Sequence, residues 1–287
     1  MDGGGRGLVL GGGGVTGIAW ETGLLHGLAE AGVDLRSADL VIGTSAGSVV
    51  GAQLRSEVTL PDLYAAQLRD PAGEIAAKIG LGAMARFAIA FAWPGDERAG
   101  RARIGRAAIK ARTVPEAERR AVIESRLPNR SWPERRLLIT AVNAETGEAQ
   151  VFDNGSGVSL TDAVAASCAV PLVWPPITIG GIRYVDGGIR SSANADLATG
   201  CDRVVVLAPV ELALRRSNRI TNQLASLGAG VRTIVVRPDA QARRAIGSNT
   251  LDPARRVASA RAGYAQAATV VESVAAIWTG VGASSVA

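Results

Sequence analysis

One stretch, residues 40–47 with the sequence LVIGTSAG, constrains the fold more than any other part of the chain. Its apolar first half predicts a short buried strand, and a helix is expected from Ser45 onward. Ser45 would then occupy a sharp turn with Gly43 and Gly47 two residues to either side, which is the G-x-S-x-G spacing of a nucleophile elbow. Glycines suit these positions because a Cβ would keep the two arms of the turn apart. A chain with 35 glycines can also produce this spacing by chance, so an ordinary turn with a capping serine is an alternative.

A second glycine-rich turn comes earlier in the chain. Residues 7–10 predict a strand, residues 11–17 have the sequence GGGGVTG, and apolar positions from Ile18 to Leu28 predict a helix. This β-α-β order predicts two neighbouring parallel strands joined by a right-handed crossover. Both glycine-rich turns should therefore lie at the carboxyl edge of the sheet, where open α/β sheets hold their sites.

The earlier turn allows two interpretations. Gly12, Gly14 and Gly17 have the G-x-G-x-x-G spacing of a dinucleotide site, but that site needs an acidic residue at the end of the second strand, where this chain has Ser45. The alternative is an oxyanion hole, in which the backbone N–H groups of Gly12, Gly13 and Gly14 meet a developing negative charge. The dipole of the helix starting near Gly17 would help. We favour the oxyanion hole because it accounts for both turns at once.

The group that would deprotonate Ser45 is not expected to be a histidine. The chain has one, His26, about nine residues into the first helix and thus ~13 Å along the axis from the glycine loop, so we expect it to be structural. Asp186 is the best carboxylate, because it directly follows a predicted strand and precedes Gly187 and Gly188, which let the chain turn and a ligand approach. A plain Asp-Gly turn is the alternative here.

Four blocks, taken in order, resemble the patatin-like phospholipases. The blocks are the glycine loop, the elbow, the Ala-Ser-x-Ala-x-Pro stretch of residues 166–171 and the sequence Asp186-Gly187-Gly188, and they fall within residues 1–55 and 160–210. Members of this family are lipid acyl hydrolases with a Ser-Asp dyad. The resemblance implies an α/β fold, a three-layer α/β/α arrangement with a mostly parallel central sheet.

The same resemblance implies roles for individual residues. Ser45 would be the nucleophile and Asp186 the proton acceptor, no metal or cofactor would be needed, and the oxyanion donors would be Gly12, Gly13 and Gly14. Many members carry a basic residue immediately before the last glycine of the loop, where this chain has Thr16. That departure leaves the headgroup preference open.

The expected reaction is a two-step acyl transfer, in which Asp186 takes the Ser45 proton while Ser45 attacks an ester carbonyl. A carboxylate is a weak base, so burial would have to raise the pKa of Asp186 toward the working pH. Two further classes stay open: an acyltransferase or thioesterase on the same scaffold, and a non-enzymatic module that binds a nucleotide or lipid.

The composition bears on partners and location. The net charge of +5 comes almost entirely from arginine, which indicates no nucleic-acid partner but would help at an anionic lipid surface. Two cysteines provide neither a disulfide framework nor a metal pattern. No signal peptide and no apolar run long enough to span a bilayer is present, so we expect a cytoplasmic or peripherally membrane-associated protein.

Residues 60–130 separate the motif blocks, and we expect them to form a helical insertion or cap on a single domain covering residues 1–287. Within them, residues 79–93 are rich in large apolar side chains and residues 98–112 are rich in arginine. An apolar strip beside a basic strip suits peripheral contact with an anionic membrane. Ordinary helical packing with a solvated basic face is the competing interpretation.

Overall fold

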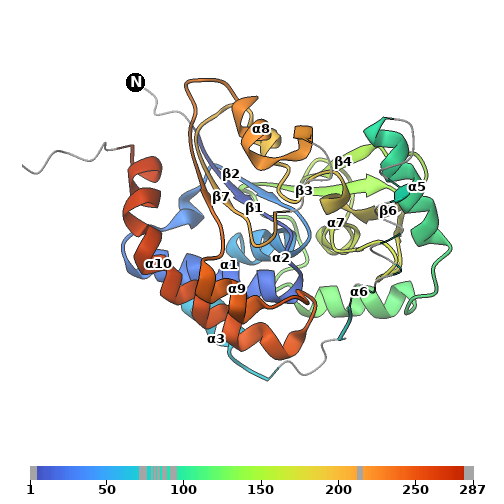
Figure 1. The fold of residues 1–287 in the computed structure, drawn as a ribbon, viewed down its shortest axis with the longest axis horizontal. Coiled ribbons are helices and arrows are strands. Elements are labelled where there is room, and N and C mark those ends of the chain that lie inside the picture. Colours follow the sequence, from blue (N-terminus) through green and yellow to red (C-terminus); the bar gives the residue numbers. More distant parts are fainter. Residues whose placement is uncertain are drawn as a thin grey trace, which may run out of the picture.

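A mixed sheet with helices on both faces organises the described part of the chain (Figure 1). The computed structural model describes residues 5–70, 76–78, 80, 82, 85, 89, 90, 96–211 and 216–280. The strands within these residues are β1 (Gly5–Leu10), β2 (Leu40–Gly43), β3 (Arg136–Asn143), β4 (Ala149–Phe152), β5 (Ile177–Ile179), β6 (Ile182–Asp186), β7 (Cys201–Leu207) and β8 (Arg232–Val236). Their order is β5-β6-β3-β2-β1-β7-β8, with β4 paired to β3.

The sheet is parallel in its centre and antiparallel on one side. Neighbours within β3-β2-β1-β7-β8 all run parallel, whereas β4 and β6 pair antiparallel with β3, and β5 pairs antiparallel with β6. The predicted α/β fold is therefore confirmed, with a mixed sheet. Leu10 pairs with Gly43, so the two glycine-rich turns do follow neighbouring parallel strands at one edge.

Helices cover both faces of this sheet. They are α1 (Gly14–Glu30), α2 (Ala46–Leu54), α3 (Leu60–Gln67), α5 (Glu97–Ile109), α6 (Glu116–Ser125), α7 (Leu160–Ser167), α8 (Ile220–Ala225), α9 (Ala240–Ile246) and α10 (Arg256–Trp278), with short 3₁₀ turns η2 (Gly187–Ile189) and η3 (Ala195–Ala198). Figure 1 shows α1, α9 and α10 on one side of the sheet and α8 on the other.

The two-residue period of the strands divides the core between these faces. Alternate strand residues join the core beneath α1, α2, α7 and α10, namely Leu8, Leu10, Val41, Val205 and Leu207. The residues between them pack against η3 and α8, namely Val9, Ile42, Val204 and Val206. Because both faces are covered, the carboxyl-terminal halves of these strands are continuous apolar runs, which is typical of central parallel strands.

The described part of the predicted insertion packs against the rest of the protein. Ile104 of α5 is buried with Val142 and Val185 from the sheet. The α5 arginines reach the β3–β4 turn, where Arg101 Nε donates to the Gly147 carbonyl at 2.8 Å and Arg106 Nη1 to the Glu145 carbonyl at 2.8 Å. Most of the apolar strip at 79–93 lies outside the described residues. No helix among the described residues is long and apolar enough to cross a membrane.

Candidate active site

Ser45 lies at the turn between β2 and α2 with a strained backbone. Its φ of 52° and ψ of −115° are unusual for a residue with a side chain, and strain of this kind concentrates at functional sites. The flanking glycines make the turn possible: a Cβ on Gly47 would overlap the Leu10 carbonyl, and one on Gly43 would lie 2.6 Å from the Gly47 oxygen. The predicted elbow geometry is therefore present, with Ser45 as the residue that precedes α2.

Asp186 is the last residue of β6, and the pairing of β6 brings it to the elbow. Asp186 pairs with Ala141 on β3. Gly43, at the end of β2, pairs with Ile139, which is only two residues earlier on β3, so β6 ends at the same edge of the sheet as Ser45. The side chains of Asp186 and Ser45 lie close enough to interact, and Asp186 Oδ1 accepts the Gly188 N–H at 2.7 Å. The structure therefore brings together the two residues predicted to form the dyad.

The environment of Asp186 suits a base. The residue is only 4 % exposed, and this burial raises the pKa of its carboxyl from 3.8 to about 6. The hydrogen bonds from Ser45 and Gly188 and the charge of Arg119 act in the opposite direction, lowering the pKa, but they are smaller than the effect of burial.

The end of α7 holds the elbow from the other side. The Ser45 N–H donates to Ser167 Oγ at 2.9 Å, and the Cys168 thiol donates to the Ser45 carbonyl at 3.2 Å. Ser48 Oγ donates to the same carbonyl at 2.6 Å. The Ala-Ser-x-Ala-x-Pro stretch thus fixes the backbone of Ser45, a role that the sequence motif did not reveal.

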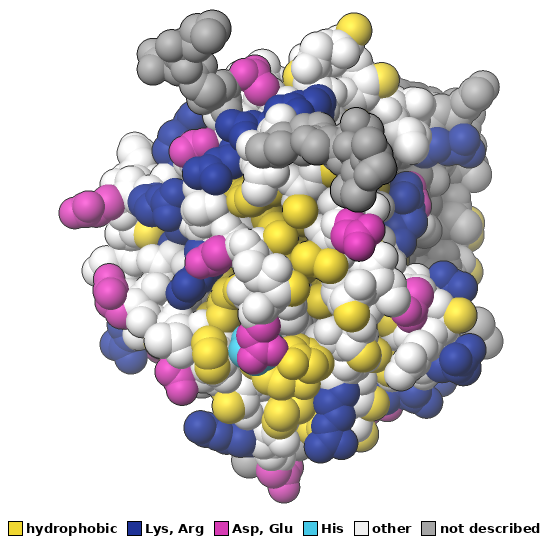
Figure 2. All heavy atoms as spheres, turned by 90° about the vertical axis from the view of Figure 1, so that its left-hand side faces the viewer, with side chains coloured by type: hydrophobic (Ala, Val, Ile, Leu, Met, Phe, Trp, Pro, Cys, Tyr) yellow, Lys and Arg dark blue, Asp and Glu magenta, His cyan; other side chains and the backbone are white. Residues whose placement is uncertain are grey.

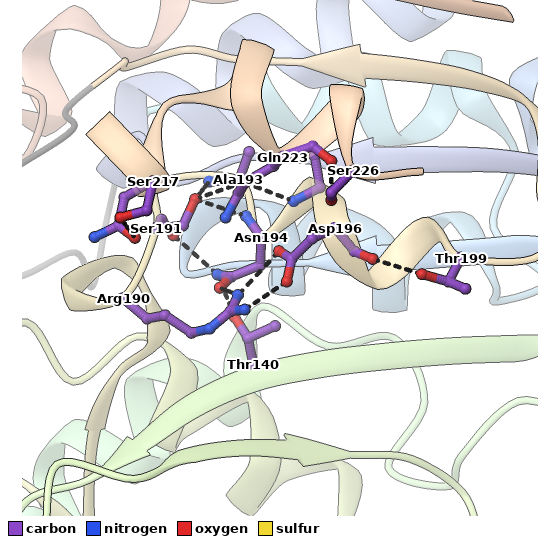
Figure 3. Close-up of polar contacts among 12 residues, drawn as sticks. Thr140, Arg190, Ser191, Ala193, Asn194, Asp196, Thr199, Ser217, Gln223 and Ser226 are labelled. Atoms are coloured by element: carbon purple, nitrogen blue, oxygen red, sulfur yellow. Dashed lines mark hydrogen bonds and ion pairs between the residues drawn. The ribbon is translucent and has the colours of Figure 1, made fainter. Parts of the chain in front are cut away.

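Asn194, which Figure 3 shows beside Ser191 and Arg190, links the segments that carry Ser45 and Asp186. This fully buried residue has a left-handed backbone, with φ of 53°. Its Nδ2 lies 3.0 Å from Thr44 Oγ1, next to Ser45 in sequence, and 3.5 Å from the carbonyl of Gly187, next to Asp186. Nδ2 also lies 3.3 Å from Thr140 Oγ1.

Arg190 sets the orientation of the Asn194 amide. Its Nη1 donates to Asn194 Oδ1 at 2.5 Å, and the same guanidinium is held by both carboxylate oxygens of Asp196 (Figure 3). Because Oδ1 accepts from Arg190, the NH₂ group of Asn194 must face the two dyad segments. The sequence analysis did not identify Asn194 or Arg190 as site residues. The only feature that could have suggested them is their position in the sequence, within eight residues after Asp186.

The glycine loop offers fewer oxyanion donors than predicted. The Gly12 N–H already donates to the Ser192 carbonyl at 2.7 Å, so the expectation that it meets the substrate is corrected. The amides of Gly13 and Gly14 have no acceptor among the described residues. Gly14 lines the Ser45 pocket with a left-handed φ of 60°, where a Cβ would overlap the Thr250 carbonyl. α1 begins at this residue rather than near Gly17, which places its positive end closer to Ser45 than expected.

The pocket at Ser45 is small and carries positive charge. Its volume of about 20 Å³ suffices for about one water molecule, and Gly14, Cys168 and Trp174 are among the residues that line it. Arg119 and Arg126, from α6 and its end, also line it, and the Arg119 guanidinium lies 4.0 Å from the centre of the Trp174 ring.

Thr16 has a structural role in place of the basic residue seen in many family members. It is fully buried, and its N–H and its hydroxyl both lie 3.2 Å from the Thr250 carbonyl. It thereby ties the glycine loop to the chain before α10. The positive charge near Ser45 comes from Arg119 and Arg126 instead.

His26 is placed away from the dyad. It follows the first residue of α1 by twelve positions, ~18 Å along the helix axis, because the helix starts earlier than predicted. Its ring packs against those of Tyr64 and Tyr264 at 4.9 and 5.5 Å, and Nε2 lies 3.5 Å from a carboxylate oxygen of Glu30. Figure 2 shows the histidine on a largely apolar face with an acidic side chain beside it.

A metal site does not form among the described residues, since no three His, Cys, Asp or Glu side chains there are placed to hold an ion. The two cysteines are buried and free, and burial is the largest effect raising the pKa of each thiol.

An α/β sheet with a serine elbow, a buried aspartate and a glycine loop at one edge defines the class of protein. The family model for patatin-like phospholipase matches residues 8–199, and the chain belongs to this family. Family membership supports lipid acyl hydrolase activity.

Solved structures of two proteins were found to be similar. VipD from Legionella pneumophila is 15 % identical with a TM-score of 0.47, over 94 % of this chain and 67 % of VipD. The type III effector protein ExoU is 15 % identical with a TM-score of 0.40, over 94 % of this chain and 53 % of ExoU. Comparison with curated proteins gives no match.

Proposed function

We propose that this protein is a carboxylic ester hydrolase of the phospholipase A, lysophospholipase or esterase type, with Ser45 as nucleophile and Asp186 as base. The observation that carries the proposal is the interaction of the Ser45 side chain with a buried carboxyl whose pKa is raised to about 6. A base with a pKa closer to neutrality accepts a proton more readily in the transition state.

The reaction follows from this geometry. Asp186 takes the hydroxyl proton while Ser45 Oγ attacks the ester carbonyl, and the N–H groups of Gly13 and Gly14 stabilise the oxyanion. Collapse of the tetrahedral intermediate releases the alcohol, which takes the proton from Asp186 and leaves the acyl group on Ser45. Asp186 then deprotonates a water molecule that attacks the acyl-enzyme, and the fatty acid leaves as Ser45 regains its proton.

Arginines at the pocket support a substrate that carries an anionic group near the ester, such as a phospholipid. Arg119 and Arg126 line the pocket with Ser45, and a guanidinium binds phosphate oxygens well. Because α6 and the residue that caps it contribute these two arginines, we propose that the 60–130 segment belongs to a single domain and forms one wall of the site. Peripheral contact with anionic membrane through the basic helix α5 is part of the same proposal.

Labelling with a fluorophosphonate probe and a panel of acyl esters, thioesters and phospholipids test the proposal. Wild type should be labelled at one serine and should hydrolyse at least one ester class. Ser45→Ala should lose both the labelling and the hydrolysis. Ser56→Ala, which lies beyond the far end of α2, should keep the labelling and the hydrolysis. Labelling that survives in Ser45→Ala would place the nucleophile elsewhere.

A further inference from the structure

The strands that lead to Ser45 and Asp186 are not neighbours in the sheet. β3 lies between β2 and β6, so the two outer strands are aligned only through their common pairing with β3. Adjacent strands lie about 4.8 Å apart, which leaves ~10 Å between β2 and β6. Ser45 comes after the end of β2, in a strained turn, so strand pairing alone does not fix the approach of its hydroxyl to Asp186.

The amide of Asn194 spans this gap. Its Nδ2 lies 3.0 Å from Thr44 Oγ1 on the β2 side, 3.3 Å from Thr140 Oγ1 on β3 and 3.5 Å from the Gly187 carbonyl on the β6 side. The hydroxyls of Thr44 and Thr140 also hydrogen-bond to each other at 2.9 Å. A Cβ on Gly187 would overlap Thr140 Oγ1, so these groups pack closely across the three strands.

The direction of the Asn194 amide is fixed by its partners. Its Oδ1 accepts from Arg190, and a guanidinium only donates, so both N–H groups lie on the other side of the amide. The two shortest contacts of Nδ2 are the Ser191 carbonyl at 2.8 Å and Thr44 Oγ1 at 3.0 Å. One N–H therefore closes the loop that carries Asn194, and the other reaches the elbow.

This loop is anchored to α8, on the other face of the sheet (Figure 3). Ser191 Oγ donates to Gln223 Oε1 at 3.0 Å, and the Ala195 N–H donates to the same oxygen at 3.1 Å. The Asn194 N–H donates to Ser191 Oγ at 3.0 Å. Buried polar networks of this kind are rigid, so the loop gives the Asn194 amide a fixed position against which the elbow is held.

We propose that Asn194 is a positioning residue, which aligns the Ser45 hydroxyl with Asp186 through its hydrogen bond to Thr44. This inference rests on the proposed function, because it takes Ser45 and Asp186 as the reacting groups. Asn194 and Thr44 are both fully buried, so neither contacts the substrate. Their loss should therefore slow the chemical step and leave substrate binding nearly unchanged.

Asparagine combines the two properties that position 194 needs. The backbone is left-handed, with φ of 53° and ψ of 41°, a conformation that Gly, Asn and Asp adopt most readily. The side chain must also accept from Arg190 and donate to Thr44. Glycine meets only the backbone requirement, and aspartate accepts but has no N–H to donate. These two substitutions therefore remove the amide donor without opposing the backbone.

Substitutions at Thr44 separate the hydrogen bond from packing, because Thr44→Ser keeps the hydroxyl and Thr44→Val keeps the shape. We would measure kcat and KM for 4-nitrophenyl butyrate, and the maximal rate and half-saturating concentration of labelling by a fluorophosphonate probe. In Thr44→Val both maximal rates should fall about 10- to 100-fold with KM and half-saturation within about twofold, whereas Thr44→Ser should retain most of each rate. A large loss in Thr44→Ser with full rates in Thr44→Val would mean that only packing matters, and would overturn the proposal.

Variants at Asn194 test the amide itself. Asn194→Gly and Asn194→Asp should both lose maximal rate by a factor similar to that of Thr44→Val, and the double variant Asn194→Gly/Thr44→Val should lose little more, because both changes remove the same contact. Ser259→Ala is the matched control: it removes a fully buried hydroxyl on α10, which donates to the Arg255 carbonyl at 2.8 Å, and should keep both maximal rates. Circular dichroism and Tm check that each variant is folded at the assay temperature. Full rates in Asn194→Gly and Asn194→Asp would overturn the proposal.

Labelling and hydrolysis together separate this inference from the proposed function. A wild type that is labelled and cleaves esters, with variants that keep both maximal rates, would overturn the positioning role and leave the hydrolase standing. Labelling that slows in the variants of a protein that cleaves no ester would support the positioning role and refute the hydrolase. A wild type that is neither labelled nor active on any ester would overturn both.

Discussion

Replacing Asp186 by Asn should abolish activity and at the same time stabilise the protein at neutral pH. The carboxyl has a pKa of about 6 in the folded state against 3.8 in its ordinary environment, so the folded state binds the proton more tightly. Stability therefore falls as pH rises from about 4 to about 6 and stays at the lower level above that. A shift of about two pKa units corresponds to about 3 kcal/mol of unfolding free energy lost at pH 8.

An asparagine avoids this loss because it carries no charge. Its carbonyl can still accept the Gly188 N–H, but its NH₂ group needs a buried acceptor, so we expect a net gain of about 1–3 kcal/mol at pH 8. For a protein of this size that raises Tm by about 2–6 °C. At pH 4.5, where Asp186 is largely protonated in the fold, the gain should largely disappear. kcat should fall about 10⁴-fold, since the dyad acts as a unit.

Thermal unfolding followed by circular dichroism at pH 4.5 and pH 8 measures the effect. Asp153→Asn is the matched control. Asp153 Oδ1 accepts the N–H of Gly155, two residues later in the chain, at 3.0 Å, as Asp186 does from Gly188, but Asp153 is exposed. Its Tm should not change in this pH-dependent way. An Asp186→Asn protein less stable than wild type at pH 8, by the same amount as at pH 4.5, would refute the reasoning.

Four further predictions follow from the site. In wild type, kcat/KM should fall tenfold per pH unit below about 6, as Asp186 becomes protonated; a profile flat down to pH 4 would exclude it as the base. Ser167→Ala should cost about 1–2 kcal/mol of stability, because the elbow N–H loses its acceptor, and should lower kcat; unchanged values in denaturant unfolding and turnover would contradict that role. His26→Gln should lower Tm and leave kcat within a few-fold, whereas a large loss of kcat at constant Tm would return histidine to the mechanism. Vesicle co-sedimentation should rise with anionic lipid, fall with salt and weaken after joint replacement by Gln of Arg101, Arg103 and Arg106. A lower Tm with unchanged binding would mean that these arginines have only structural roles, Arg101 and Arg106 at the β3–β4 turn and Arg103 at the Ala90 carbonyl.

Local rules of the chain were enough to predict that Ser45 and Asp186 would lie at one site. The elbow follows from the need for Cβ-free residues at Gly43 and Gly47, and Asp186 from its position between a strand and two glycines. The strands before the two glycine-rich turns were predicted because a short apolar run that ends at a turn indicates a buried strand. Short helices were missed: α8 and α9 have only 6 and 7 residues, too few for a clear period.

Contacts between distant parts of the chain were not predictable. The Gly12 amide is occupied by a carbonyl from Ser192, and the pocket charges come from α6, in the segment that showed no motif. The helical start at Gly14 also escaped prediction, because a run of glycines has no intrinsic preference for helix. In each case the feature depends on residues of another helix, strand or loop. The distance in sequence between the contacting residues follows no pattern that could be recognised in advance.

The supports of Ser45 have a consequence for the order in which the protein acquires its structure during synthesis. The strained elbow is held by Ser167 and, through Thr44, by Thr140 and Asn194, all of which follow it by a long distance in the chain. Strain persists only where surrounding structure enforces it, and the chain leaves the ribosome from its N-terminus. A nascent chain that ends before Asp186 therefore contains Ser45 in a relaxed turn, without the carboxylate that we propose as its base. The proposed site is completed late, so we expect a partly made chain to lack lipid hydrolase activity.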